Sequence, residues 1–395
     1  MNKPSVSVII PTKNGGELFE SCLEAIIRQK YCGRMELIVV DSGSTDGTID
    51  KARAVGASVY VIDPADFNHS RTRNNAVEHA HNDIIVFTVQ DAVASNTNWL
   101  DNLVAALGDE YAAAFGRQTP HDDADIFAQF EINFQNEDIG SSPRTFCIPE
   151  GQMFDQIPYD DALALIKLDN VCSVYRRTLL KKYPFPDIVY AEDIAWAHRI
   201  IMQGYKIRYD PTIEVFHSHN RPPSYRLHRA FAHTVAMHQI TGRVPFDLSC
   251  IDAEGIKRYD ERMERLLLDI KSNLVATPQN GFCFSGMKKP VRKLISGAMA
   301  KRFIKKNIHR IPGGISKKLI YYLLLKVAAN RIMTCVDICR SSNPKITMDE
   351  LSSVVDQMAA LSTGTFIGMV YASYLQKEDV SDKIQDYAEK LLGRA

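Results

Sequence analysis

Several short stretches of the sequence carry side chains that could bind a metal ion or move a proton. FTVQDA ends an apolar run with one carboxylate, Asp91, at the point where a strand would stop. A carboxylate can bind a hard cation whose other ligands are phosphate, water or a distant side chain, and Gln90 could add its amide or a water. Asp91 is therefore a candidate metal ligand. The alternative is a solvated acid at a strand end.

Two further pairs of residues have the chemistry of metal ligands or proton acceptors. HSH ends a predicted strand with His217 and His219 at i and i+2, on one face, where they could bind a metal or be structural. AED places Glu192 and Asp193 at a predicted helix start, where acids favour the helix dipole in any case. A general base for a sugar hydroxyl must be a carboxylate or an imidazole, so either acid could serve.

Two polar stretches at predicted helix starts could bind a nucleotide. DSGSTDGT puts Asp41 at a strand end, where its carboxylate could accept hydrogen bonds from a base or ribose, although capping by Ser44 or Asp46 also explains the stretch. FNHSRTRNNA gathers His69, Arg71, Arg73 and Asn74. Two arginines at a helix start conflict with the dipole, and a bound diphosphate would remove that conflict. A solvated basic turn is the alternative.

These side chains must be positioned by the alternating elements of the first third of the chain. Strand-like runs at 5–10, 35–42, 58–63 and 83–91 alternate with helical patterns at 17–29, 45–56 and 71–81. This alternation predicts βαβ units and a parallel sheet covered by helices on both faces. PTKN, DSGSTDG and QDA all follow strands, at the edge where such sheets bind ligands.

The alternation continues less regularly to about residue 245. We predict helices at 96–110 and 191–204, a strand at 172–177, a strand pair or bent strand at 206–219, and a polar loop region between 117 and 160. Beyond residue 245 the chain reads as helical. The sequence therefore predicts an α/β domain over 1–245 and an α-helical domain over 246–395.

Taken in order, the motifs resemble a known family. SVIIPTKN, VVDSGSTDGT, FNHSRTRN, IVFTVQDA, YAEDIAWAHRIIMQGYKI and VFHSH resemble inverting family 2 glycosyltransferases, in particular their bacterial rhamnosyltransferase-like branch. The resemblance covers about residues 5–240. It implies a GT-A fold, a Rossmann-like and mainly parallel sheet with flanking helices. The implied reaction moves a sugar, L-rhamnose from dTDP-rhamnose, to a hydroxyl of a growing, lipid-linked bacterial surface polysaccharide.

The resemblance also implies roles for individual residues. Asp91 matches the acid retained at the family's Asp-x-Asp position and would bind Mg²⁺ or Mn²⁺, with His217 and His219 as further metal contacts. Asp193 matches the catalytic base, with Glu192 beside it. The implied donor-binding residues are Pro11, Thr12, Asn14, Asp41, Ser44, His69, Arg73, Asn74 and Gln90, with Arg73 near the diphosphate. Ser70 and Val89 stand where the branch usually has Gly and Thr, in the region of the donor pocket.

The formal net charge of zero hides a segregation of charge. Between Asp269 and Asp337 there is no other acid, while Lys and Arg occur 14 times, so the rest of the chain has 33 basic against 47 acidic residues. In 287–330 apolar residues recur at helical spacing among the basic ones, which predicts a segment lying on anionic lipid. Packing on the catalytic domain, or on a second copy in a homo-oligomer, is the alternative. Nucleic acid is not an expected partner, because no aromatic platform or known motif is apparent.

The location and two rival functions follow from what the sequence lacks. No signal-peptide pattern opens it, its eight cysteines form no CxxC pair, and no run of about 18 apolar residues occurs. We expect a cytoplasmic protein, peripheral on the inner face of the cell membrane and acting on a polyprenyl-diphosphate-linked acceptor. The rivals are a sugar nucleotidyltransferase, for which PTKNGGE is a poor phosphate loop, and a scaffold subunit that keeps the fold without turnover.

Overall fold

The chain folds into two compact units. The computed structural model describes residues 3–245, 247–275, 317–343, 345–377, 380 and 382–392. One unit holds residues 1–123 and 131–219, and the other holds 124–130 and 220–395. The chain thus changes unit after His219, whereas the sequence placed the domain boundary near residue 245. The difference between the two boundaries is the helix α9 (Pro223–Thr241), which belongs with the helices of the second unit.

A mixed sheet forms the centre of the first unit. Within the described residues it has nine strands in the order β3-β2-β1-β4-β8-β6-β9-β5, with β7 also paired to β9. The strands are β1 (Val6–Thr12), β2 (Met35–Asp41), β3 (Ser58–Val61), β4 (Ile84–Thr88), β5 (Val93–Ala94), β6 (Ala113–Thr119), β7 (Arg144–Phe146), β8 (Cys172–Arg176) and β9 (Ile207–Phe216). The first four in this order are parallel, as predicted, whereas β8 is antiparallel to β4 and β6. The residues that precede β8 therefore lie at the edge where the parallel strands end.

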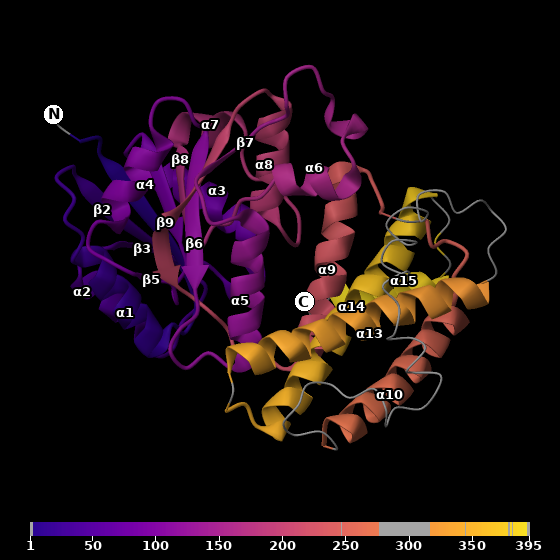
Figure 1. Cartoon of the computed structure of the whole chain (residues 1–395). Helices are drawn as coiled ribbons and strands as arrows, with labels where there is room; N and C mark the ends of the chain where they lie inside the picture. Colours follow the sequence, from indigo (N-terminus) through magenta and orange to yellow (C-terminus); the bar gives the residue numbers. More distant parts are fainter. Residues whose placement is uncertain are drawn as a thin grey trace. The chain divides into compact units, whose positions relative to one another are not determined.

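Helices cover both faces of this sheet (Figure 1). On one face lie α1 (Gly16–Ile27), α2 (Thr48–Ala54) and α4 (Trp99–Leu107), and on the other lie α3 (His69–His79), α7 (Arg177–Lys182) and α8 (Glu192–Met202). Consecutive residues of β1, such as Val8 and Ile9, point to opposite faces of the sheet and are both fully buried, because each face is covered. The predicted layered α/β architecture is confirmed.

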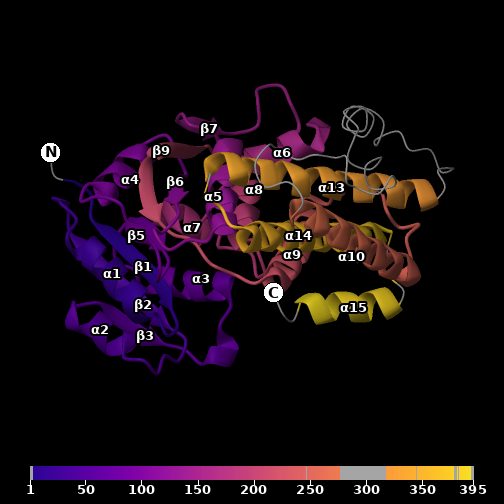
Figure 2. The same ribbon diagram turned by 60° about the horizontal axis from the view of Figure 1, so that its bottom comes forward.

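The second unit is helical, as predicted. Besides α9 it contains α10 (Ala253–Val275), α13 (Lys317–Ser342), α14 (Met348–Gln376) and α15 (Asp382–Leu392) (Figure 2). Helices α9 and α14 approach so closely that a Cβ on Gly364 would lie 2.1 Å from the carbonyl oxygen of Leu227. A Cβ on Gly368 would lie 3.0 Å from the carbonyl oxygen of Phe231. The two glycines thus let the helix backbones meet, which ties α9 to this unit.

Helix α14 is the described helix that is long and apolar enough, by length and composition, to cross a membrane. Of its most apolar window, however, 67% is buried inside the protein. Helices α9, α10 and α13 all pack against it. This degree of burial is typical of the central helix of a globular domain.

The basic segment 287–330 falls mostly outside the described residues, which resume at Lys317 in α13. In the part of α13 whose side chains are described, Leu325, Ala328 and Ala329 are buried in the core shared with α10 and α14. The apolar residues at this end of the segment therefore pack within the second unit itself.

The region between 117 and 160 is more ordered than predicted. It contains α5 (Ile126–Ile139), β7, a 3₁₀ turn (Phe154–Gln156) and the start of α6 (Tyr159–Leu165). The first turn of α5 belongs to the second unit, where Phe127 is buried, and the rest belongs to the first, where Ile132 and Ile139 are buried. One helix that serves two cores has no single apolar stripe, so the periodicity that reveals a helix is weak.

Candidate active site

Three loops follow the carboxyl ends of β1, β2 and β4, and side-chain hydrogen bonds tie them together. Gln90, after β4, accepts a bond from the backbone N–H of Lys13 (2.7 Å) and donates one to its carbonyl (3.2 Å). The N–H of Asn14 donates to Ser44 Oγ (2.7 Å), and Asn14 Oδ1 accepts from the N–H of Thr45 (2.9 Å). Asn14 has a φ of +47°, a conformation that such surrounding bonds must hold. The loops therefore form one rigid cradle.

Asp41 is the centre of the second loop. It is fully buried and accepts four hydrogen bonds, from Thr12 Oγ1 (2.9 Å), the N–H of Gly43 (3.0 Å), and both the N–H (2.7 Å) and Oγ (2.5 Å) of Ser44. Gly43 has a φ of +85°, and a Cβ there would meet Pro64 at 2.8 Å. The carboxylate thus fixes the turn. The structure brings together the predicted donor-binding residues Pro11, Thr12, Asn14, Asp41, Ser44 and Gln90 at this edge.

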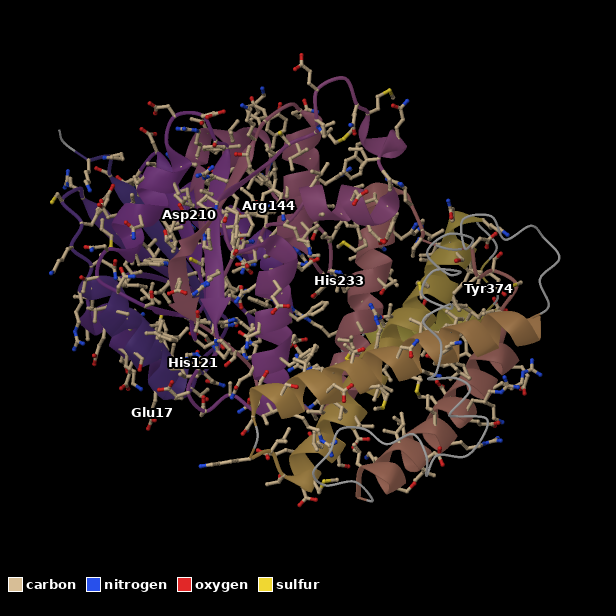
Figure 3. The ribbon with its side chains drawn as sticks, in the orientation of Figure 1. Glu17, His121, Arg144, Asp210, His233 and Tyr374 are labelled. Carbon is tan, nitrogen blue, oxygen red and sulfur yellow. The ribbon has the colours of Figure 1, made fainter. Side chains whose placement is uncertain are left out.

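Asp91, His217 and His219 form a cluster at the same edge of the sheet. Asp91 Oδ1 lies 3.6 Å from His217 Nε2, and Asp91 Oδ2 lies 3.5 Å from His219 Nδ1. His121, which is labelled in Figure 3 just beyond the end of β6, contacts the carbonyl oxygen of Asp91 through its Nε2 at 3.0 Å. The sequence stretches QDA and HSH, more than a hundred residues apart, therefore meet in space.

The cluster fits a divalent cation. One oxygen and two nitrogen ligand atoms lie within 4.8 Å of one another. A cation about 2.1 Å from each ligand would hold any two of them no more than about 4.2 Å apart, so a small closure of the cluster suffices. Carboxylates suit Mg²⁺ and Mn²⁺, while imidazole favours transition metals. This mixed donor set suits a divalent cation.

A second buried constellation joins α3 to the start of α8. Arg73 and Glu192 form an ion pair, with 2.5 Å between Arg73 Nη1 and Glu192 Oε1, and both side chains are less than a tenth exposed. Asn170 Nδ2 donates to the same carboxylate oxygen at 3.0 Å. Burial alone would raise the pKa of Glu192, but the charges of Arg73 and His69 and the Asn170 hydrogen bond bring it below its usual range. Glu192 is thus a buried anion that holds Arg73.

Asp193, the adjacent acid, behaves in the opposite way. Its carboxylate accepts bonds from the N–H groups of Ile194 (2.8 Å) and Asn170 (3.3 Å). Burial, together with the negative charges of Glu192 and Asp169, raises its pKa to about 8. A carboxyl group with such a pKa can take up a proton near neutral pH, which is the property of a general base. Its neighbour Ala191 has a φ of +64°, so the backbone that aims Asp193 is held in an unusual conformation.

The remaining donor candidates of α3 have structural partners. Asn74 pairs with the backbone of Phe185, donating to its carbonyl (2.9 Å) and accepting from its N–H (3.0 Å). Asn68 caps α3 and donates to the carbonyl of Ile188 (3.2 Å). His69 Nδ1 lies 3.3 Å from Arg73 Nη1. Helix α3 therefore anchors the segment that leads into Glu192 and Asp193, and the donor-binding roles of His69 and Asn74 stay predictions.

Comparison with known proteins identifies the family. The sequence profile of glycosyl transferase family 2 matches residues 7–183. The O-antigen chain rhamnosyltransferase RfbN of Salmonella typhimurium is 32% identical over 267 residues, which are 66% of this chain and 81% of that protein. The chain belongs to glycosyl transferase family 2. WbaN of Salmonella anatum, also an O-antigen chain rhamnosyltransferase, is 31% identical over 268 residues, or 67% of this chain and 82% of that protein.

This family 2 member is a glycosyltransferase, and its first unit has the GT-A fold expected from the sequence. Among solved structures, the mannosyltransferase PcManGT from Pyrobaculum calidifontis, in complex with GDP-Man and Mn²⁺, superposes with a TM-score of 0.48 at 21% identity. The superposition covers 84% of this chain and 88% of that one.

Sequence reasoning missed four residues of this candidate site: Gln118, His121, Asp169 and Asn170. Gln118 bonds His217 Nδ1 (2.7 Å) and Asp169 (3.1 Å). Asp169 and Asn170 precede β8, and only the antiparallel direction of β8 brings them to the site. The pair of polar residues before an apolar strand was the available signal, but the sequence did not give the strand's direction.

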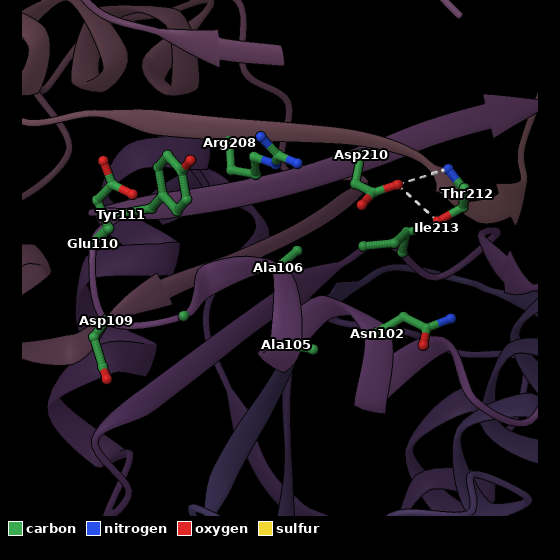
Figure 4. A pocket seen from close by; sticks show the side chains of 11 residues that line it. Asn102, Ala105, Ala106, Asp109, Glu110, Tyr111, Arg208, Asp210, Thr212 and Ile213 are labelled. Atoms are coloured by element: carbon green, nitrogen blue, oxygen red, sulfur yellow. Dashed lines mark hydrogen bonds between the residues drawn. The ribbon is translucent and has the colours of Figure 1, made fainter. Parts of the chain in front are cut away.

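A surface pocket of the first unit lies apart from this site. Figure 4 shows it between the end of α4 and β9. Its volume is about 510 Å³. Asp210 accepts hydrogen bonds there from the N–H (3.0 Å) and Oγ1 (2.7 Å) of Thr212, and Tyr111 and Arg208 line it. None of Asp91, His217 and His219 lines this pocket, so it is separate from the metal cluster.

Proposed function

We propose that this protein is a metal-dependent inverting rhamnosyltransferase, which moves L-rhamnose from dTDP-rhamnose to a hydroxyl of a lipid-linked bacterial surface polysaccharide. The observation that carries the proposal is the Asp91, His217 and His219 cluster on the same sheet edge as Asp193, in a chain that covers 81% of an O-antigen chain rhamnosyltransferase. The names of RfbN and WbaN support rhamnose and an O-antigen acceptor.

Asp193 acts as the general base. It takes the proton from the acceptor hydroxyl while that oxygen forms a bond to the anomeric carbon, from the face opposite the nucleotide. The bond from the anomeric carbon to the β-phosphate oxygen breaks, and the nucleoside diphosphate leaves with the electron pair. Attack from the opposite face inverts the configuration. Ala191 and Asn170 hold Asp193 in place for this step.

The other residues bind and orient the donor. Thr12, Asn14, Asp41, Ser44 and Gln90 shape the cradle for base and ribose. A divalent cation held by the metal cluster would supply positive charge to the departing diphosphate. Arg73 is engaged by Glu192, so its nearest task is to fix the acid pair, and direct contact with the diphosphate stays a prediction.

A thermal-shift panel tests the donor site. Donor and metal that bind only the native state raise the melting temperature. We expect dTDP-rhamnose with Mn²⁺ to give a larger shift than UDP- or GDP-sugars, and Asp91→Asn to lose the Mn²⁺-dependent part. Release of dTDP, and transfer of rhamnose to a polyprenyl-diphosphate-linked acceptor, should likewise require Mn²⁺ and be lost in Asp91→Asn.

The rivals predict other results. A scaffold subunit would bind no nucleotide-sugar or would bind without releasing dTDP. A nucleotidyltransferase would release pyrophosphate when supplied with a nucleoside triphosphate and a sugar phosphate. Either result would overturn the proposal, whereas Asp91-dependent release of dTDP supports it.

A further inference from the structure

A line of hydrogen bonds crosses three adjacent strands and ends at the metal cluster. Asp169 lies just before β8, Gln118 lies in β6, and His217 follows β9, and these strands are neighbours in the order β8-β6-β9. Gln118 Nε2 lies 3.1 Å from Asp169 Oδ2, and Gln118 Oε1 lies 2.7 Å from His217 Nδ1. Gln118 and His217 are both buried. The line lies within the first unit and none of its bonds requires a ligand.

The backbone around this line is fixed as well. The N–H of His217 donates to the carbonyl of Thr119 at 2.8 Å, directly after the ladder in which Gln118 pairs with Val215. A register shift between Phe115 and Arg117 precedes this pairing. The two side chains thus project from paired strands, where their relative position is set by the sheet.

The carboxyl group of Asp169, at one end of this line, decides which atoms donate and which accept along it. Asp169 Oδ1 accepts from the N–H groups of Val171 (3.0 Å) and Cys172 (3.3 Å), so donors surround this carboxyl group. An accepting carboxylate requires the Gln118 amide to present its NH₂ group on that side. The amide oxygen then faces His217, so Nδ1 of His217 must carry the proton. A neutral imidazole protonated at Nδ1 has its lone pair at Nε2.

We propose that Gln118 is a positioning residue for the metal site: oriented by Asp169, its amide holds His217 in the tautomer whose Nε2 lone pair faces Asp91. This inference rests on the metal site proposed above. With the amide reversed, Nε2 would carry the proton and donate to Asp91 instead of binding a cation. Partners of this kind behind a metal-binding imidazole change metal affinity by about 10–100-fold when removed.

The test measures Mn²⁺ binding to the metal-free, full-length protein, without turnover. Free Mn²⁺ is followed by its EPR signal during titration. We expect Gln118→Met, which keeps the length of the side chain and removes both polar ends, to bind Mn²⁺ about 10–100-fold more weakly. Gln203→Met, at the exposed end of α8, is the matched control and should bind as the wild type does.

A double variant tests the direction of the line. In Gln118→Glu/Asp169→Asn, the carboxylate and the amide exchange places, so the total charge is unchanged. The carboxylate at position 118 still accepts from His217 Nδ1, and the bond to position 169 is reversed, because the amide there now donates to the carboxylate at 118. We expect Mn²⁺ affinity within a few-fold of the wild type, or tighter, because a carboxylate partner raises the basicity of the imidazole.

Each outcome decides a separate point. Wild-type affinity in a folded Gln118→Met protein would overturn the inference and leave the metal site standing. Loss of Mn²⁺ binding in a folded double variant would also overturn it, which keeps the test decisive even if Gln118→Met fails to fold. If the wild type shows no Mn²⁺ binding that Asp91→Asn removes, the proposed metal site fails, and the inference fails with it.

Discussion

Two adjacent acids, Glu192 and Asp193, show how position decides the chemistry of a side chain. Glu192 is held as an anion by Arg73 and Asn170, and its pKa is lowered despite burial. Asp193 has no basic partner at hydrogen-bond distance among the described contacts, and burial beside Glu192 and Asp169 raises its pKa to about 8. The pair thus separates into a structural anion and a proton acceptor, which is a common division of roles between neighbouring carboxyl groups.

The raised pKa of Asp193 predicts opposite effects on activity and stability for Asp193→Asn. The variant should bind donor with near-normal affinity, because Asp193 acts on the acceptor, while turnover falls roughly 10²–10⁴-fold. An acid whose folded pKa exceeds its unfolded value costs stability as pH rises from about 4 to about 8. The asparagine has no charge to bury. Melting temperatures at pH 5 and pH 9 should therefore show the variant gaining on the wild type at pH 9.

In free energy of unfolding, the variant should gain on the order of 2 kcal/mol over the wild type at pH 9. This is less than the full pKa shift implies, because relaxation and solvent screening reduce the cost of the buried charge. The wild-type rate should rise with pH and level off above about pH 8, as the base becomes ionised. A variant that turns over normally would remove Asp193 from catalysis. An equal change in melting temperature for both proteins between pH 5 and pH 9 would contradict the buried-charge argument.

At the level of residues, the sequence predicted the polar groups but not their partners. QDA and HSH were recognised as metal-ligand types, and they do meet. The acid pair could be placed at a helix start, but its separation into two roles depends on Arg73, 119 residues away in sequence. Asn74 has the right type for a ligand contact, yet the backbone of Phe185 uses both of its polar ends. Long-range pairing of this kind leaves no local pattern.

At the level of elements, the close approach of α9 and α14 predicts an unusual response to a small substitution. In a solvated helix, Gly→Ala stabilises by about 1 kcal/mol because alanine has the higher helix propensity. At Gly364 the new Cβ would lie 2.1 Å from the carbonyl oxygen of Leu227, so the helices must separate. We expect Gly364→Ala to destabilise the protein by about 1–3 kcal/mol, measured by urea unfolding.

Thr365→Ala is the matched control on the next position of α14. Its hydroxyl bonds only the carbonyl of Leu361 in its own helix, among the described contacts, so its removal should leave stability nearly unchanged. If Gly364→Ala were as stable as the wild type, the helices would have to tolerate a wider spacing than the structure has.

The sequence predicted well the helices that have one apolar face and the strands that are apolar on both faces. The first strands and α1, α3 and α8 appear within a few residues of their predicted bounds, because burial gives them a clear period. Helix α5 was missed because its apolar residues serve two units. The direction of β8 was not predictable either, since a strand buried on both faces reads the same whether parallel or antiparallel.

At the level of the whole molecule, the uneven distribution of charge predicts binding to anionic membranes. The sequence between Asp269 and Asp337 contains 14 basic residues and no acidic ones. Each basic residue near an anionic surface contributes about 1 kcal/mol. We therefore expect the full-length protein to float with phosphatidylserine-containing vesicles at low salt, and to detach as salt screens the charge.

Replacing four basic residues of this segment, Lys301, Arg302, Lys305 and Lys306, with glutamine should abolish flotation. Pure phosphatidylcholine vesicles are the control and should not bind the wild type. Failure to bind anionic vesicles at low salt would favour packing of the segment on the protein itself or on a second copy.

The cradle formed by the first two loops and Gln90 has a consequence for what this enzyme selects. A carboxylate offers about four acceptor sites, and Asp41 already uses four, while Asn14 Oδ1, Ser44 Oγ and the Gln90 amide are bonded to the protein itself. A nucleobase would therefore be recognised mainly by shape and by backbone groups. Thymine and uracil differ by one methyl group, a difference that pockets discriminate only weakly. The sugar would then decide which donor is used, and the supply of activated sugars in the cell would decide which polymer is made.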